Sequence, residues 1–125
     1  GFKPCRQQNC PVCDQLKDKS KIIRSITCSA TGESVEIRNK LTCTTRNVIY
    51  CITCKRGGRA CPDNPQYIGE TKLSLRERLR PVGVHFRTAG VPIEKIHQDG
   101  RTRKARERFY IRKFDVVRAG LNIKN

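Results

Sequence analysis

Two short β-prone segments, each with a tyrosine, and the helix predicted after them constrain the fold of this chain more than any other feature. Residues 47–52 (Asn-Val-Ile-Tyr-Cys-Ile) and 66–69 (Gln-Tyr-Ile-Gly) have the β-branched and aromatic composition of strands. A Gly-, Pro- and Asp-rich segment joins them, which predicts an antiparallel hairpin. Ser74, with Glu77 three residues later, forms the capping-box pattern of a helix start, and Pro81 predicts an early end.

A second hairpin and a second helix flank this core. Residues 22–37 contain two strand-like segments around an Ala-Thr-Gly-Glu turn signal, whereas residues 81–101 have the composition of a loop. Residues 102–118 place apolar side chains at helical spacing. The sequence therefore predicts an α+β fold, a small antiparallel sheet flanked by helices. It divides into a Cys-rich extension with a hairpin (1–46) and a core (47–125).

The charge of the chain indicates its kind of partner. The 125 residues include 27 Lys and Arg against 11 Asp and Glu, a net charge of +16. An excess of this size favours a polyanionic partner, most simply nucleic acid. The sequence has no apolar run long enough to cross a bilayer, so no membrane partner is expected. Hydrophobic residues make up only 36%, which predicts a thin core that needs additional support.

Eight cysteines provide a candidate for that support. The spacings Cys5-x4-Cys10-x2-Cys13 and Cys51-x2-Cys54 are tight clusters of the kind that bind a metal. They favour structural zinc and a reducing, intracellular location over disulfides. The alternative is a disulfide-rich, secreted basic protein, which the same even cysteine count would also allow.

The order of these motifs resembles the core of the GIY-YIG nucleases. Residues 48–50 (Val-Ile-Tyr) stand for the GIY strand, with valine in place of glycine, and residues 67–69 (Tyr-Ile-Gly) match the YIG strand fully. Glu107 opens the segment Glu-Arg-Phe-Tyr-Ile-Arg-Lys-Phe, which is similar to the metal-binding helix of the family. Asn122 follows fifteen residues later, where the family has a supporting asparagine.

The resemblance implies a metal-dependent endonuclease and gives roles to individual residues. Arg76 falls where the family presents a phosphate-binding arginine, and Arg78 is the alternative. Tyr50 is the implied general base, assisted by a second tyrosine or by His85. A neutral tyrosine is a poor base, so neighbouring cations would have to lower its pKa. Glu107 is implied to hold Mg²⁺ or Mn²⁺. The implied catalytic residues are Tyr50, Tyr67, Arg76, Arg78, His85, Glu107 and Asn122.

The similarity extends to the endonuclease domain of Penelope-like retroelements. Residues 47–54 (Asn-Val-Ile-Tyr-Cys-Ile-Thr-Cys), the segment that starts Tyr-Ile-Gly-Glu-Thr, and the upstream Pro4-Cys5 and Thr42-Cys43 pairs all resemble that subfamily. The resemblance implies a nuclear protein that nicks DNA and supplies a 3′ end to a linked reverse transcriptase, with an RNA template as a further partner. The absence of an initiator Met is consistent with a fragment of a longer protein.

Two zinc sites are predicted from the cysteines and histidines. The first consists of Cys5, Cys10, Cys13 and Cys43, with Cys28 as a possible replacement for Cys43. The second consists of Cys54, Cys61, His85 and His97, with Cys51 as a competitor. Both sites would have all four positions filled, as in structural zinc sites. The family's mixed cysteine and histidine site has a histidine at the end of the arginine helix, where this chain has Pro81 instead.

Glu107 separates the endonuclease hypothesis from its main alternative. It lies four residues before Ile111 and so shares the predicted buried side of the second helix, where an unpaired carboxylate is costly. A metal ion or an arginine would explain it. The alternative is a non-catalytic, zinc-containing nucleic-acid-binding module, which would have no need of this carboxylate.

Overall fold

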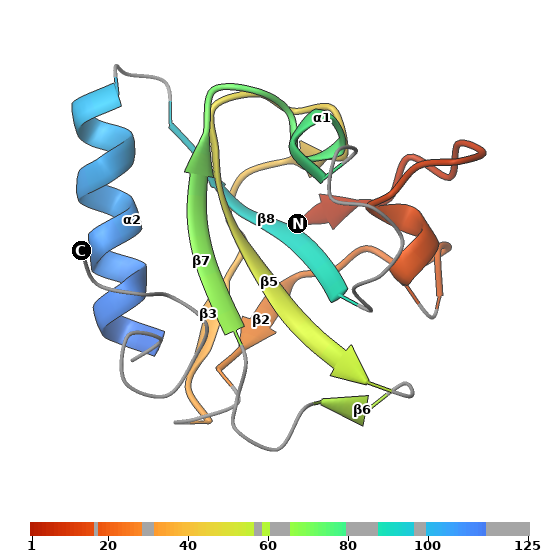
Figure 1. Ribbon diagram of the computed structural model, residues 1–125, viewed down its shortest axis with the longest axis horizontal. Helices are drawn as coiled ribbons and strands as arrows, with labels where there is room; N and C mark the ends of the chain where they lie inside the picture. The colour runs from red at the N-terminus through yellow and green to blue at the C-terminus, as the bar shows by residue number, and fades with distance from the viewer. Residues whose placement is uncertain are drawn as a thin grey trace.

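The computed structural model is an α+β arrangement of small sheets and two helices (Figure 1). It describes residues 1–16, 18–28, 32–56, 59–60, 66–79, 88–96 and 100–114. The main sheet is built around the nine-residue strand β5 (Val48–Arg56). Strand β7 (Gln66–Thr71) pairs antiparallel with β5, with Tyr50 opposite Gly69. The predicted hairpin of the two tyrosine strands is confirmed, and both strands extend beyond their predicted ends.

The remaining strands are short, apart from β8. Strand β6 (Arg59–Ala60) pairs with the end of β5. Strands β2 (Ser25–Thr27) and β3 (Ser34–Glu36) form the hairpin predicted for residues 22–37. Strands β1 (Phe2–Lys3) and β4 (Leu41–Thr42) pair in parallel. A 3₁₀ turn, η1 (Cys13–Gln15), lies in the Cys-rich segment.

Strand β8 (Thr88–Lys95) pairs antiparallel with β5, so the prediction of a loop across residues 81–101 is wrong for this part. Gly90 and Pro92 led to this wrong prediction, because glycine and proline are both disfavoured in strand interiors. Among the described strands β8 pairs with β5 alone, and its register shifts beside Pro92. A proline is tolerated at such an edge or irregularity, since it has no N–H to contribute.

Helix α1 (Leu75–Leu79) begins as predicted at a capping box. The Ser74 hydroxyl accepts a hydrogen bond from the Glu77 amide at 3.2 Å, and the Glu77 carboxylate accepts one from the Ser74 amide at 3.4 Å. Helix α2 (Gly100–Phe114) begins two residues before its predicted start, and residues 115–118 of the prediction lie outside the described chain. Helix α2 runs beside β7 (Figure 1).

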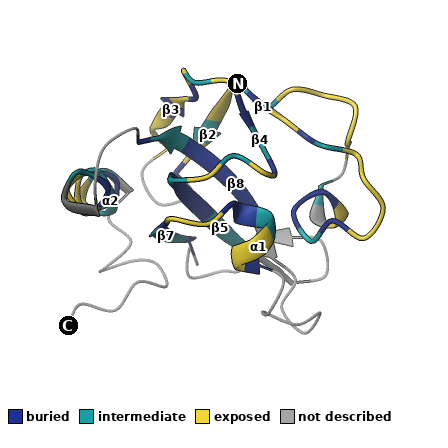
Figure 2. Ribbon diagram, turned by 90° about the horizontal axis from the view of Figure 1, so that it is seen from above, coloured by how far each residue is buried: buried dark blue, intermediate teal, exposed yellow. Residues whose placement is uncertain are grey.

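Two buried clusters cover the two faces of the sheet, and β5 contributes alternate residues to each. Figure 2 shows that β5 and β8 are mostly buried, whereas α2 has both buried and exposed positions. We call the first cluster the tyrosine face; it joins the N-terminal segment and α1 to the sheet and includes Phe2, Cys13, Leu41, Cys43, Val48, Tyr50, Leu75 and Leu79. We call the second the α2 face; it includes Cys28, Val35, Ile49, Cys51, Ile68, Ile93, Ile96 and Tyr110.

Candidate functional site

The two predicted tyrosines lie together on the tyrosine face. The ring centroids of Tyr50 and Tyr67 are 6.1 Å apart, with the planes inclined by 41°. Gly69, opposite Tyr50 in the sheet, makes this packing possible. A Cβ atom at this position would lie 2.5 Å from the Tyr50 hydroxyl and 2.7 Å from Cε1 of Tyr67. The glycine of the Tyr-Ile-Gly motif therefore leaves the space in which the phenol of Tyr50 sits.

Of the two candidate arginines, Arg78 is the one that meets the tyrosines. Its guanidinium interacts with the phenol of Tyr50, and this interaction raises the pKa of Arg78. Arg76, the position preferred from the sequence, lies instead against the cysteines: its Nη2 donates to Sγ of Cys5 at 2.8 Å. Helical periodicity indicates only that the two arginines have different neighbours, because residues two apart leave a helix on nearly opposite sides.

The environment of Tyr50 keeps its phenol protonated. Burial, followed by the neighbouring Tyr67, raises the pKa of Tyr50 to about 12, against a smaller lowering effect of Arg78. Only 2% of the residue is exposed. The net direction is opposite to what a general base needs. In this arrangement Tyr50 is therefore a hydrogen-bond donor at neutral pH.

Glu107 lies half-buried on α2, next to a second carboxylate that sequence reasoning did not single out. Burial, and then the charge of Glu70, raise the pKa of Glu107, while Lys104 and the backbone amide of Glu70 act in the opposite direction. Glu70 also interacts electrostatically with Arg78. Glu70 is therefore the group that interacts both with Glu107 on the α2 face and with Arg78, which meets Tyr50 on the tyrosine face. The position of Glu70 directly after Tyr-Ile-Gly was the available signal.

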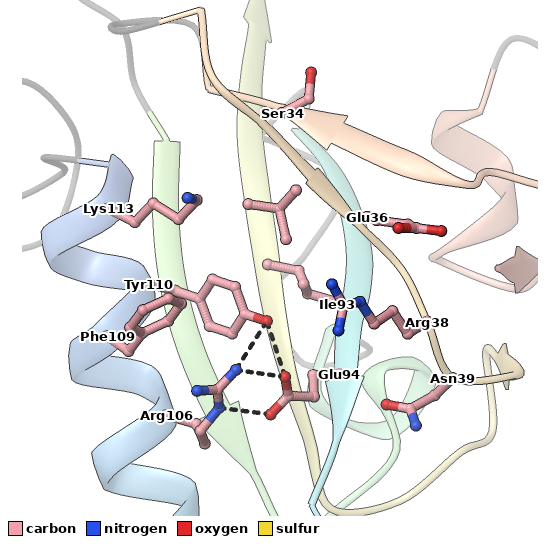
Figure 3. A pocket seen from close by; sticks show the side chains of 11 residues that line it. Ser34, Glu36, Arg38, Asn39, Ile93, Glu94, Arg106, Phe109, Tyr110 and Lys113 are labelled. Atoms are coloured by element: carbon pink, nitrogen blue, oxygen red, sulfur yellow. Dashed lines mark hydrogen bonds and ion pairs between the residues drawn. The ribbon is translucent and has the colours of Figure 1, made fainter.

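Ion pairs attach α2 to the sheet. Arg103 is only 5% exposed, and its Nε donates to the Glu70 carboxylate at 2.7 Å. Arg106 makes two hydrogen bonds of 2.8 Å with Glu94, whose carboxylate also accepts one from the Tyr110 hydroxyl at 2.9 Å (Figure 3). The predicted apolar stripe is therefore only part of the contact.

The outer side of α2 carries a basic stripe, which we define as Lys104, Arg108 and Arg112. These three residues are exposed and lie at intervals of four, on one side of the helix. Like charges at this spacing disfavour an isolated helix. Lys104 and Arg108 also act on the charge of Glu107 and lower its pKa, so the stripe borders the carboxylate.

The four cysteines of the first predicted metal site converge. The Sγ atoms of Cys5, Cys10, Cys13 and Cys43 all lie within 4.8 Å of one another. Cys13 Sγ is 3.6 Å from Cys5 Sγ and 3.4 Å from Cys43 Sγ. Four sulfurs around one zinc at about 2.3 Å would be about 3.8 Å apart, whereas a disulfide needs about 2.05 Å. The cluster could therefore hold a metal such as zinc. Cys28 lies apart from it, on the α2 face near Cys51.

The sulfurs of this cluster differ in their tendency to ionise. Burial opposes the thiolate of Cys5, but hydrogen bonds from the Gln7 amide and from Arg76 lower its pKa to about 6. Burial raises the pKa of Cys13 and of Cys43. Hydrogen bonds to Cys10 and then Cys5 raise the pKa of Arg76. The guanidinium of Arg76 thus lies beside Cys5, the sulfur whose thiolate form is stabilised.

Several predicted site residues fall outside the described chain. The side chain of Cys54, which lies in β5, is not among the described ones, and neither are Cys61, His85, His97 and Asn122. The second zinc site and the supporting asparagine therefore stay predictions.

Comparisons with known proteins add no family to this description. No protein-family model, curated protein or solved structure matches the chain. Among the described helices, none has the length and apolarity that a membrane span requires.

Proposed function

We propose that this chain is a divalent-metal-dependent DNA endonuclease module of the GIY-YIG type that nicks one strand. One observation carries the proposal: the guanidinium of Arg78 interacts with the phenol of Tyr50, beside Tyr67 and within electrostatic range of Glu70. Cleavage of a phosphodiester requires a group that binds the phosphoryl oxygens and a group that orients water. An arginine paired to a buried phenol offers both.

Each residue of this group has a role that follows from its surroundings. Arg78 would bind the scissile phosphate through its planar guanidinium. Tyr50, protonated at neutral pH, would donate a hydrogen bond to the attacking water or to a phosphate oxygen. Tyr67 would support the ring of Tyr50, since the two rings are in contact. Gly69 leaves the space that the phenol of Tyr50 occupies, because it has no Cβ atom.

The carboxylates fit the metal that this chemistry needs. Burial, and then the charge of Glu70, raise the pKa of Glu107, and a hard cation held by Glu107 would favour its charged form. Glu107 would hold Mg²⁺ or Mn²⁺, which would supply Lewis-acid stabilisation of the phosphoryl charge. The zinc proposed for the cysteine cluster has a structural role, because four cysteines leave no open position.

The basic stripe gives the module a surface for the DNA backbone. Its three exposed cations follow the axis of α2, and two of them, Lys104 and Arg108, act on Glu107. Neutralising phosphates in this way makes affinity fall with salt, with a slope of about −0.9 per phosphate contacted. The stripe offers no base readout of its own, so we propose binding with little sequence preference. The similarity to Penelope-like elements supports a nuclear role in which the nick provides a 3′ end to a linked reverse transcriptase on its RNA template.

A plasmid assay with matched variants tests the proposal. We expect the wild-type protein with Mg²⁺ or Mn²⁺ to convert supercoiled plasmid to the nicked form. Glu107→Ala should reduce the rate by about 100-fold or more, as should Arg78→Gln, because each removes a group that stabilises the transition state. DNA affinity of Glu107→Ala should be unchanged or higher, since a negative charge is lost. Glu36→Ala, which removes an exposed carboxylate on β3, is the control and should nick normally.

The outcome separates the two hypotheses. A wild-type protein that binds DNA but never relaxes the plasmid with either metal would establish the non-catalytic binding module. Equal nicking by wild type and Glu107→Ala would remove the carboxylate from the mechanism.

A further inference from the structure

We propose that Arg76 is a positioning residue that joins the cysteine cluster to α1, so that a metal bound by the cluster fixes Arg78 against Tyr50. This inference rests on the proposed function for its catalytic consequence, but its structural part can be measured separately. It assigns to Arg76 a role different from the phosphate contact predicted for it.

The contacts of Arg76 run to three of the four cysteines. Its Nη2 donates to Cys5 Sγ at 2.8 Å, and its guanidinium also interacts with Cys10. Its backbone amide donates to the carbonyl oxygen of Cys43 at 3.0 Å. Four thiolates around Zn²⁺ carry a net charge of −2, and an arginine at hydrogen-bond distance offsets part of it. Partners of this kind orient metal ligands and tune their affinity.

The two arginines of helix α1 lie on different sides of this short helix. Leu75 and Leu79 are buried, so the helix faces the core with that side. Successive residues differ by about 100° around a helix axis, which puts Arg76 and Arg78 on opposite flanks of the leucines. Arg76 faces the sulfurs and Arg78 the phenol. A rotation or shift of α1 that releases one contact also moves the other.

The helix is too short to fix its own position. It has five residues, and helices shorter than about 12 residues are marginal without tertiary contacts. The contact of Arg76 with sulfur has a cost in free energy. Within the described chain, Nε of Arg76 is buried and has no hydrogen-bond partner. An unsatisfied buried donor costs about 1–3 kcal/mol, which the interaction with the thiolates has to offset.

Amide hydrogen exchange, zinc affinity and nicking together test the coupling. The Arg78 amide donates to the Ser74 carbonyl at 2.9 Å, so its exchange rate reports whether α1 stays formed and docked. Arg76→Gln is compared with Arg76→Lys and with Arg24→Gln, an exposed arginine of the N-terminal segment. Measurements at saturating zinc keep the cluster filled, and the Ile96 amide, which donates to the Asn47 carbonyl at 2.8 Å, reports on the sheet.

We expect Arg76→Gln to weaken zinc binding by about 10- to 100-fold and to lower nicking by a similar factor. At saturating zinc, the Arg78 amide should still exchange about tenfold faster than in wild type, as expected when a hydrogen bond to a charged group is lost, while exchange of the Ile96 amide is unchanged. Arg76→Lys should recover part of the zinc affinity through its charge, and Arg24→Gln should behave as wild type.

Two results would overturn the inference. The first is wild-type zinc affinity together with wild-type Arg78 exchange in Arg76→Gln. The second is weakened zinc binding with no change in Arg78 exchange, since the cluster and the helix would then be independent. If the wild-type protein never nicks DNA, the proposed function fails, whereas the exchange and zinc measurements still decide on the role of Arg76.

Discussion

The two faces of the main sheet are held in different ways. On the tyrosine face, α1 and the N-terminal segment pack through apolar and sulfur-containing side chains, and the close approach depends on glycines. On the α2 face, the helix is also held by ion pairs, of which Arg103 with Glu70 is the most buried. The first attachment depends on shape, and the second also depends on charge.

This difference places the proposed catalytic groups in contrasting surroundings. Tyr50 sits in a close-packed site where neighbouring atoms leave no room for an added methyl group. Glu107 sits beside a carboxylate and several cations, where its charge responds to each neighbour. Steric changes should therefore disturb the tyrosines, and charge changes should disturb the carboxylates.

The largest effect is expected from removal of the buried arginine of the α2 face. Arg103→Met removes the ion-pair partner of Glu70 in a site where the Glu70 side chain is only 19% exposed. Breaking a buried pair from one side costs about 3 kcal/mol or more. Urea unfolding would measure the loss, and Arg103→Met combined with Glu70→Met should be less destabilised than Arg103→Met alone. Equal stability of Arg103→Met and wild type would show that α2 is held by apolar contacts.

A smaller effect is expected from a methyl group on the tyrosine face. Gly69→Ala puts Cβ against the rings of Tyr50 and Tyr67, so the rings must move. Overpacking of this kind costs about 1–3 kcal/mol, and nicking should fall with it. The matched control is Gly90→Ala, whose Cβ would meet Cδ1 of Leu79 at 2.9 Å. That terminal methyl can rotate away, so thermal unfolding should show a smaller loss. The reverse order would contradict the steric account.

The smallest effect is expected from the charge of Glu107 on stability. Its pKa is raised above 4.5 by burial and by Glu70, so the folded state favours the protonated form. The stabilisation that protonated Glu107 gives the folded state is present at low pH. It is lost as the pH rises from 4.5 through the pKa of Glu107 in the folded state. Glu107→Gln should therefore be more stable than wild type at neutral pH without divalent ions, by roughly a few tenths of a kcal/mol after solvent screening.

Divalent ions should reverse that order. Thermal unfolding with Mg²⁺ should stabilise wild type more than Glu107→Gln, because the cation relieves the repulsion between the carboxylates. Identical Mg²⁺ effects on both proteins would place the ion elsewhere.

Local patterns predicted what depends on neighbouring residues in the chain. The hairpin of the tyrosine strands, the second hairpin, the capping box at Ser74 and the α+β class all follow from spacing and propensity. Strand β8 was not predicted, because Gly90 and Pro92 have low strand propensity. Its pairing with β5 overrides that low propensity. The set of cysteines at the cluster was available from spacing, apart from the choice between Cys28 and Cys43.

The sequence by itself determined the charge, the strand pair and the identity of the groups that could bind metal and phosphate. Only the tertiary structure decided which arginine meets the phenol, that Glu70 lies beside Glu107, and that Arg76 faces the sulfurs. These contacts join residues up to 71 positions apart. Patterns among neighbouring residues cannot predict contacts at such separations, because the docking of a helix on a sheet sets the direction of its side chains.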